Sequence, residues 1–259
     1  MKIIDCKGIR EEILNEETAA RLKGQEFLVL LKDNSPENQS YLKSIRRSAE
    51  KYGVSMVTIP LPKNAATWDI DYAIKEEALK NREGRLPKAV LMVGFTQEEM
   101  LRTSKLSSVL HNVTLLDSPF NPDVVRAVET IMRSVMGDKF DRPTRTVVIG
   151  RSELAVKAGF RLLIYNHTVV FCHTQTESLE EYCRSADVIV SFAGCPNLIT
   201  GNMVKDGAVI VSVGCGFKDG KLCGDIDMDS MKEQDVLVTS TPGGVGLVTT
   251  ALLFESITM

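Results

Sequence analysis

Two glycine-bearing turns in this chain could hold a phosphate or the polar edge of a flat ring. Gly150-Arg151-Ser152 follows the apolar run Val147–Ile149, and Pro242-Gly243-Gly244 follows Val236–Val238. A turn of this kind between a strand and a helix leaves backbone N–H groups unobstructed at a helix N-terminus, where anions bind. A Gly-Gly pair alone is better explained by a flexible turn before a terminal helix. The second such turn, with alternating strands and helices between the two, favours a binding site.

The residues after the second strand of this half bear on the choice of dinucleotide. A Rossmann domain that selects NAD usually carries a carboxylate there, bound to the ribose hydroxyls. Here the positions hold His173, Thr174 and Thr176, and Arg151 offers a fixed cationic fork to a phosphate. We therefore predict NADP, with NAD the weaker candidate. The alternatives are a surface arginine beside a turn and a partly buried His173 that is hydrogen-bonded to backbone.

Two further strand ends are expected to complete the cofactor wall. One is Phe192–Pro196, which contains Gly194, and the other is Val213–Cys215, which contains Gly214. In parallel α/β sheets, ligands bind outside the carboxyl ends of the strands. The predicted cofactor residues are Gly150, Arg151, Ser152, His173, Thr174, Thr176, Gly194, Gly214, Gly243 and Gly244.

Four segments, in this order and spacing, resemble the signatures of the methylenetetrahydrofolate dehydrogenase/cyclohydrolase family. They are Gly150–Ser152, Cys172–Thr176, Gly224–Asp227 and Pro242–Gly246. The resemblance extends from about residue 119 to the end and is thinner before that. It implies an NADP-dependent oxidoreductase of one-carbon metabolism, a folate-type substrate and a homodimer. It also implies that Arg151 and Thr174 contact the 2′-phosphate, and that Tyr41, Pro242, Gly243 and Gly244 contact the substrate.

One departure lies beside the first glycine turn. The family usually continues with a Val-Gly-x-Pro stretch, whereas this chain has Val156 and Ala158 where that glycine and proline are expected. A side chain at 156 would project where backbone usually approaches the cofactor. We therefore expect a displaced loop and weaker cofactor binding.

The larger departure concerns catalysis. The family places a lysine four residues after a tyrosine, so that both lie on one helix face over the folate. The matching tyrosine is Tyr41, but the position four residues on holds Ile45. Lys43 lies about 200° round the helix from Tyr41. Arg46 is one position too far, and its pKa is too high for proton transfer.

Other folate-binding features are also missing. The family's Gln-Leu-Pro stretch is replaced by Val93-Gly94-Phe95, and its Pro-Cys-Thr-Pro stretch by Pro119-Phe120-Asn121-Pro122. The region 103–117 is too short for the family's Asp-Val-Asp-Gly segment. We expect cyclohydrolase activity to be lost, since it needs proton transfer, while dehydrogenase activity survives. The alternatives are a dehydrogenase for another small substrate, and a non-catalytic relative that binds nucleotide or a protein partner.

Composition excludes several classes of function. The chain has 259 residues, of which 44% are apolar, and a net charge of −3, which gives no electrostatic reason to expect nucleic acid or an anionic membrane. No apolar run reaches the roughly 18 residues of a membrane span, and the first residues lack a signal-peptide pattern. The six cysteines and three histidines have no metal-ligand spacing. We expect no metal, mostly buried thiols and a reducing cytoplasm.

The elements that position these residues alternate between strand and helix, which predicts α/β domains with mostly parallel sheets. The N-terminal α/β domain is predicted at 1–120 together with 249–259, and the linking helix with a Rossmann-type domain at 121–248, with a cleft between them. Asn121 is expected to cap the linking helix and Pro122 to begin it. The expected strands are 27–31, 54–59, 89–93, 113–116, 146–149, 169–172, 188–191, 208–213 and 236–238. The expected helices are 36–52, 69–80, 97–110, 121–137, 156–165 and 179–186, with a hairpin turn at 218–221.

Overall fold

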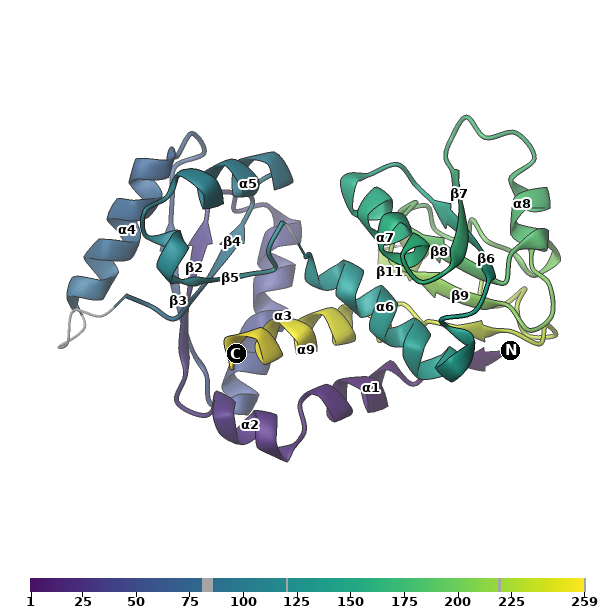
Figure 1. Cartoon of the computed structure of the whole chain (residues 1–259), viewed down its shortest axis with the longest axis horizontal. Helices are drawn as coiled ribbons and strands as arrows, with labels where there is room; N and C mark the ends of the chain where they lie inside the picture. Colours follow the sequence, from purple (N-terminus) through teal and green to yellow (C-terminus); the bar gives the residue numbers. More distant parts are fainter. Residues whose placement is uncertain (81–85, 120, 219, 259) are drawn as a thin grey trace. The chain divides into compact units, whose positions relative to one another are not determined.

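The computed structural model describes residues 1–80, 86–119, 121–218 and 220–258 and divides the chain into two compact units (Figure 1). Unit 1 comprises Met1–Glu12 with Val124–Thr249, and unit 2 comprises Ile13–Asp123 with Thr250–Met259. Each unit has its own parallel sheet and its own hydrophobic core. The mixed α/β class with mostly parallel sheets is the one that the sequence predicts.

The first residues differ from the prediction. Residues 1–12 were expected in the N-terminal domain, but the short strand β1 (Lys2–Ile3) pairs in parallel with β12 (Leu237–Val238) of unit 1. The N–H of Lys2 donates to the carbonyl of Val236 at 2.8 Å. A two-residue strand carries almost no sequence pattern, and its partner is more than 200 residues away, so no local rule assigns it.

Unit 2 is built on a four-stranded parallel sheet with the order β3-β2-β4-β5. Its elements are α2 (Glu16–Leu22), β2 (Glu26–Leu31), α3 (Pro36–Tyr52), β3 (Ser55–Pro60), α4 (Thr67–Lys80), β4 (Ala89–Val93), α5 (Gln97–Leu106), η1 (Leu110–Asn112) and β5 (Thr114–Leu116), together with the end of α9 (Val245–Ile257). Helix α5 thus ends before residue 110, where the sequence predicted its end, and a separate short helix follows.

Both faces of this sheet are buried. Along β2, Phe27 and Val29 belong to one apolar cluster, while Leu28 and Leu30 belong to a second one. Successive side chains of a strand point to opposite faces, so the alternation assigns each cluster to one face. Helix α3 and the last turns of α9 contribute to the first cluster, and α4 and α5 contribute to the second.

Helix α3 has the ends that its sequence predicts. The Ser35 hydroxyl accepts the N–H of Asn38 at 3.4 Å, and Gly53 ends the helix in the left-handed region at φ 65°. A serine N-cap and a glycine after the last turn satisfy otherwise unpaired backbone groups. The register of the helix, and hence the direction of Tyr41 and Ile45, is therefore fixed at both ends.

Unit 1 is built on a six-stranded parallel sheet with the order β1-β12-β9-β8-β6-β7. The chain runs from β6 outward to β7 and then returns to the other side of β6 at β8, which makes a topological switch point. Its remaining elements are α1 (Cys6–Ile13), α6 (Asp123–Met136), η2 (Gly137–Lys139), β6 (Thr144–Ile149), α7 (Glu153–Leu163), β7 (His167–Cys172), α8 (Leu179–Ser185), β8 (Val188–Ser191), η3 (Gly201–Met203), β9 (Val209–Ser212), β10 (Cys215–Lys218) and β11 (Lys221–Gly224).

The predicted hairpin is present. Strands β10 and β11 are antiparallel, and Lys218 pairs with Lys221 across the turn. Residue 219, which the sequence places in this turn, lies outside the described residues.

The start of the linking helix corrects a prediction. Asn121 was expected to cap it and Pro122 to begin it, but α6 begins at Asp123. The Asp117 carboxylate accepts the N–H of Asp123 at 2.9 Å. A side chain six residues upstream therefore caps the helix, which a rule limited to neighbouring residues does not anticipate.

The cysteines also differ from the prediction that most are buried. Cys6, Cys172 and Cys183 are buried, whereas Cys195 and Cys215 are exposed. The last one, Cys223, is half-buried. These three lie in the loop after β8 and in the β10–β11 hairpin instead of in the sheet core.

Within the described ranges, no helix is long and apolar enough to cross a membrane.

A buried histidine gives unit 1 a pH-dependent stability. His167 Nε2 lies 3.0 Å from the carbonyl oxygen of Phe140, which can only accept, so Nε2 carries a proton. Its Nδ1 lies 2.7 Å from the Thr146 hydroxyl, which donates to it when the ring is neutral. Burial lowers the pKa of His167, while the Phe140 carbonyl and the charges of Asp141 and Asp187 raise it in part.

We therefore expect stability to fall as the pH drops below about 6.5, the pKa of an unfolded histidine. The unfolded chain gains its proton first, so this contribution is complete above that pH and is lost toward the lower folded pKa. Thermal unfolding between about pH 7.5 and 5.5 measures it. A His167→Gln variant should have a flatter profile, whereas His111→Gln, at an exposed position, should keep the slope. An unchanged slope in His167→Gln would contradict the assignment.

Candidate functional site

The predicted cofactor residues of unit 1 gather at one edge of its sheet. Because all six strands are parallel, their carboxyl ends lie at the same edge. Each predicted segment follows one strand there: 150–152 follows β6, 173–176 follows β7, 194 follows β8, 214 follows β9 and 242–244 follows β12. The structure thus brings together residues from five separate parts of the sequence.

The turn after β6 requires a glycine. Gly150 has φ 131°, and a Cβ at this position would lie 3.1 Å from Cβ of Phe192. The hydroxyl of Ser152 accepts the N–H of Ala155 at 3.3 Å and so caps α7. The turn therefore delivers the chain directly into a helix N-terminus, the geometry that suits an anion.

Arg151 and Thr174 are both exposed. Within the residues that the structure describes, neither side chain makes a hydrogen bond or an ion pair. A guanidinium and a hydroxyl without internal partners can both bind a ligand phosphate.

His173 and Thr176 are instead engaged in the turn after β7. The N–H of His173 donates to the Thr176 hydroxyl at 2.8 Å, and the N–H of Gln175 donates to His173 Nδ1 at 3.2 Å. The sequence alternative of a backbone-bonded histidine is therefore correct in its bonding, but His173 is exposed and not partly buried. These two residues shape the turn that presents Thr174.

The turn after β12 is closely packed. Gly243 has φ 98°, and a Cβ on Gly244 would lie 2.2 Å from the carbonyl oxygen of Ser240. The preceding Thr241–Pro242 bond is cis. Pro242 and Gly243 are exposed and Gly244 is buried, so only the first part of this turn is open to a ligand.

The substitutions beside the first turn do not interrupt α7. The N–H of Val156 donates to the carbonyl of Ser152 at 3.0 Å, as in a regular first helical turn. Val156 is half-exposed and Ala158 is buried. The valine side chain therefore adds bulk at the surface of the N-terminal turn without distorting it.

The position at which the family resemblance predicts a catalytic lysine holds no ionisable group. Ile45 is fully buried, with an exposed fraction of 0%, and belongs to the same apolar cluster as Leu42 and Ala49 of α3. Tyr41 packs against this cluster and is partly buried. Lys43 is exposed on the other side of the helix. The tyrosine and the apolar position that follows it are thus arranged as the spacing predicts.

Two acidic residues near Tyr41 were missed by the sequence reasoning. Burial raises the pKa of Tyr41 strongly, and the charges of Asp117 and Asp123 raise it further. Burial also raises the pKa of Asp117, partly offset by the hydrogen bond from the Asp123 N–H. The phenol therefore stays protonated and acts as a hydrogen-bond donor. An aspartate directly after a strand was the available signal, as strand ends carry functional side chains in such sheets.

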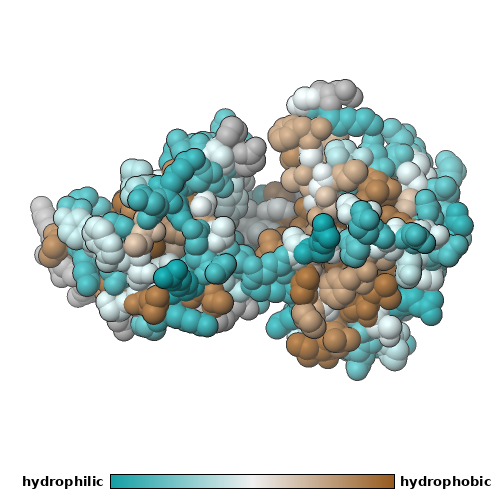
Figure 2. Space-filling model, turned by 90° about the horizontal axis from the view of Figure 1, so that it is seen from above, coloured by the Kyte–Doolittle hydropathy of each residue, from teal (hydrophilic) through white to brown (hydrophobic). Residues whose placement is uncertain are grey.

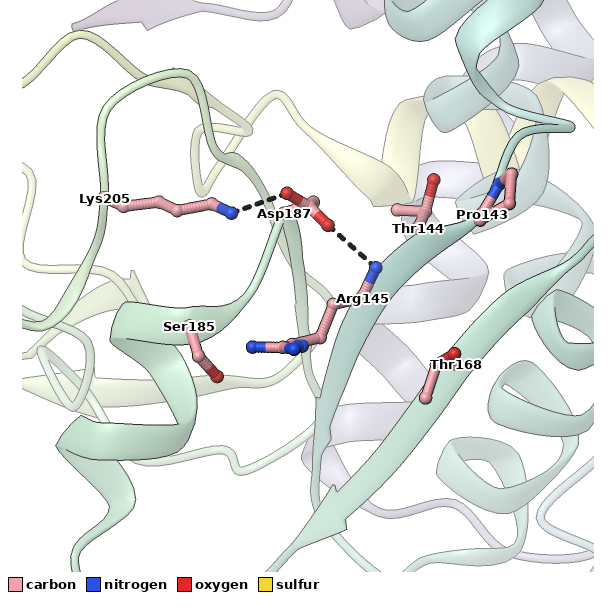
Figure 3. Close-up of a pocket in the computed structure, with 7 residues that line it drawn as sticks. All are labelled: Pro143, Thr144, Arg145, Thr168, Ser185, Asp187 and Lys205. Atoms are coloured by element: carbon pink, nitrogen blue, oxygen red, sulfur yellow. Dashed lines mark hydrogen bonds and ion pairs between the residues drawn. The ribbon is translucent and has the colours of Figure 1, made fainter.

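A pocket on unit 1 lies at the opposite edge of the sheet (Figure 3). Asp187 accepts the backbone N–H of Arg145 at 2.8 Å and contacts the Lys205 ammonium at 2.5 Å. These residues stand at the amino ends of the strands, and none of them was predicted as a site residue. The lining residues are Pro143, Thr144, Arg145, Thr168, Ser185, Asp187 and Lys205.

Comparison with known proteins gives three matches of different kinds. The model of the family described as "Tetrahydrofolate dehydrogenase/cyclohydrolase, NAD(P)-binding domain" matches residues 124–259. The chain is 32% identical to the bifunctional protein FolD of Desulfovibrio desulfuricans, over 98% of this chain and 95% of that protein. The crystal structure of the bifunctional enzyme FolD from Campylobacter jejuni has a TM-score of 0.79 and 23% identity, and the match covers 100% of this chain and 97% of that one.

A further solved structure, FolD of Trypanosoma brucei, is described as complexed with NADP cofactor and inhibitor. It has a TM-score of 0.73 and 19% identity, and the match covers 98% of this chain and 95% of that one. At these identities the structural likeness establishes the fold.

Proposed function

Because the chain belongs to the tetrahydrofolate dehydrogenase/cyclohydrolase family, we propose that it is an NADP-dependent methylenetetrahydrofolate dehydrogenase whose cyclohydrolase activity is lost. The observation that carries the proposal is a contrast between the two units. The carboxyl edge of unit 1 has glycine turns and an exposed Arg151, whereas a fully buried Ile45 lies at the predicted lysine position of unit 2.

The residues of unit 1 fit a dinucleotide phosphate. The turn at Gly150 brings backbone to a helix N-terminus, and Arg151 and Thr174 supply a cation and a hydroxyl. No carboxylate occupies residues 173–176, so a 2′-phosphate meets no like charge there. The NADP complex of the Trypanosoma brucei relative supports this choice. When bound, NADP supplies the acceptor for a hydride from the methylene carbon.

The residues of unit 2 fit the dehydrogenase reaction better than the cyclohydrolase reaction. Hydride transfer depends mainly on holding two rings in contact, which needs orientation and not a proton acceptor. Tyr41, protonated and half-buried, can donate a hydrogen bond to a folate ring. Hydrolysis of the methenyl product needs a water to be activated. Ile45 offers no group for that step.

The second candidate is a re-purposed nucleotide-binding relative that acts on another small substrate or on a protein partner. It is favoured by the loss of most folate-binding features while Tyr41 is kept. Isothermal titration with NADP and with tetrahydrofolate separates the candidates. Binding of both supports the dehydrogenase, and binding of NADP alone supports the relative with another role.

Cofactor selectivity provides a sharper prediction. An Arg151→Ala variant should lose about ten- to a hundredfold in NADP affinity, since a hydrogen-bonded charge contact contributes about 1.5–3 kcal/mol. Its NAD affinity should change little, because NAD has no 2′-phosphate. The matched control is Arg145→Ala, which removes an exposed arginine at the opposite edge of the same sheet. Equal affinities of the unmodified protein for NADP and NAD would contradict the assignment of Arg151 and Thr174.

We also propose a homodimer, as the family resemblance implies. Apolar side chains at the C-terminal end of α7 support an interface on unit 1: Phe160, Leu163 and Ile164 are 60%, 54% and 72% exposed. Figure 2 shows apolar residues at the surface of this unit, on the right of the view. Such clusters mark protein contacts more often than free surface. Light scattering should give twice the chain mass, and a monomer at micromolar concentration would overturn this proposal.

A further inference from the structure

Asp225 is a fully buried carboxylate that the sequence reasoning treated only as part of a signature segment. It has an exposed fraction of 0% and follows β11. Its Oδ2 accepts the Ser191 hydroxyl at 2.6 Å and the N–H of Ala193 at 3.0 Å, and its Oδ1 accepts the N–H of Cys195 at 2.8 Å. Across the described part of the chain, no lysine, arginine or histidine forms an ion pair with it. Its partners are therefore the last residue of β8 and the loop that follows this strand.

The backbone of Asp225 is held just as firmly. Its N–H donates to the Ser212 hydroxyl at 2.9 Å, and the N–H of Ser212 donates to the Thr239 hydroxyl at 2.8 Å. Ser212 and Thr239 are both buried. The hydrogen bonds of Asp225 thus connect the ends of β8, β9 and β12, which are three of the five strands whose ends carry predicted cofactor residues.

Two glycines make room for this carboxylate. A Cβ on Gly214 would lie 2.3 Å from Oδ2 of Asp225 and 2.4 Å from the backbone nitrogen of Gly194. Gly194 itself has φ 64°, a conformation that favours glycine. The loops after β8 and β9 therefore approach each other closely beside the Asp225 carboxylate. A residue with a side chain at 214 would have to displace this carboxylate.

We propose that Asp225 is a positioning residue that fixes the loop 193–195 in its cofactor-binding conformation. The claim rests on the proposed binding of NADP at this edge. Ala193, Gly194 and Cys195 are exposed, so little packing restrains them, and the two N–H bonds to one carboxylate supply the restraint instead. A loop that is ordered before binding loses less conformational entropy when the ligand arrives. The carboxylate therefore acts on the cofactor through the loop, without contact.

The test compares Asp225→Asn with Asp187→Asn. In the first variant, an amide NH₂ replaces one oxygen and faces a backbone N–H in either orientation. The control removes a carboxylate that also accepts a backbone N–H, at the opposite edge of the same sheet. Two quantities are measured for each: the dissociation constant for NADP by titration, and the hydrogen exchange of the Ala193 and Cys195 amides.

Asp225→Asn should bind NADP at least about tenfold more weakly and lose amide protection at 193 and 195. Asp187→Asn should keep both the NADP affinity and the amide protection of the unmodified protein. Unchanged protection in Asp225→Asn overturns the proposal, as does lost protection with unchanged affinity. If the unmodified protein binds no NADP, the proposed function fails and this proposal fails with it, a result distinct from the other two. Should Asp225→Asn not fold, Gly214→Ala serves, because its Cβ displaces the same carboxylate, and the same outcomes apply.

Discussion

An Ile45→Lys variant should lose several kcal/mol of folding free energy. The side chain is fully buried in the apolar cluster between α3 and the sheet of unit 2. An ammonium placed there is removed from water, and the packing of the isoleucine is lost at the same time. The Asp117 carboxyl near Tyr41 could pair with the new charge, but its own burial, which raises its pKa, makes it a costly partner. Urea unfolding followed by circular dichroism measures the change.

Two controls separate charge from packing in this experiment. Ser44→Lys adds the same side chain one residue earlier, at an exposed position of α3, and should change stability by less than about 0.5 kcal/mol. Ile45→Met keeps an apolar chain at the buried position and should cost less than about 1.5 kcal/mol. An Ile45→Lys protein as stable as Ser44→Lys would mean that the side chain reaches water, and that position 45 is not part of the core.

Much of the fold follows from local sequence patterns. The ends of α3 are encoded by Ser35 and Gly53, and the fully apolar run of β4 is typical of a buried parallel strand. The order of strands and helices is sufficient to predict two parallel sheets. The carboxyl edge of unit 1 follows from the same order, because each predicted segment comes directly after a strand.

What the sequence could not predict depends on contacts between distant residues. Strand β1 pairs with β12 across almost the whole chain. Asp117 caps α6 from six residues before its first residue, and it also lies near Tyr41, which belongs to α3. The three donors to Asp225 come from residues at least 30 positions away. Each of these contacts is set by tertiary packing, so the helical or strand periodicity of the sequence does not predict it.

The second large effect is expected in catalysis. The unmodified protein should hydrolyse the methenyl substrate no faster than buffer, because Ile45 cannot transfer a proton and the raised pKa of Tyr41 keeps the phenol protonated. Ile45→Lys restores the lysine to the Tyr41 face of α3. If this variant is folded under the assay conditions, its hydrolysis rate should exceed that of the unmodified protein. Arg46→Lys, which places a lysine at an exposed position about 140° round the helix from Tyr41, should not exceed it.

One time course tests the central claim, that dehydrogenase chemistry persists without cyclohydrolase chemistry. The unmodified protein is mixed with methylenetetrahydrofolate and NADP, and the reduced nicotinamide and methenyl chromophores are followed together. The predicted result is that both rise in equal amounts, with the methenyl signal decaying only at its enzyme-free rate. Formation of reduced nicotinamide while the methenyl signal stays low would contradict the claim. It would show that another group, with Asp117 the first candidate, activates the water in place of the missing lysine.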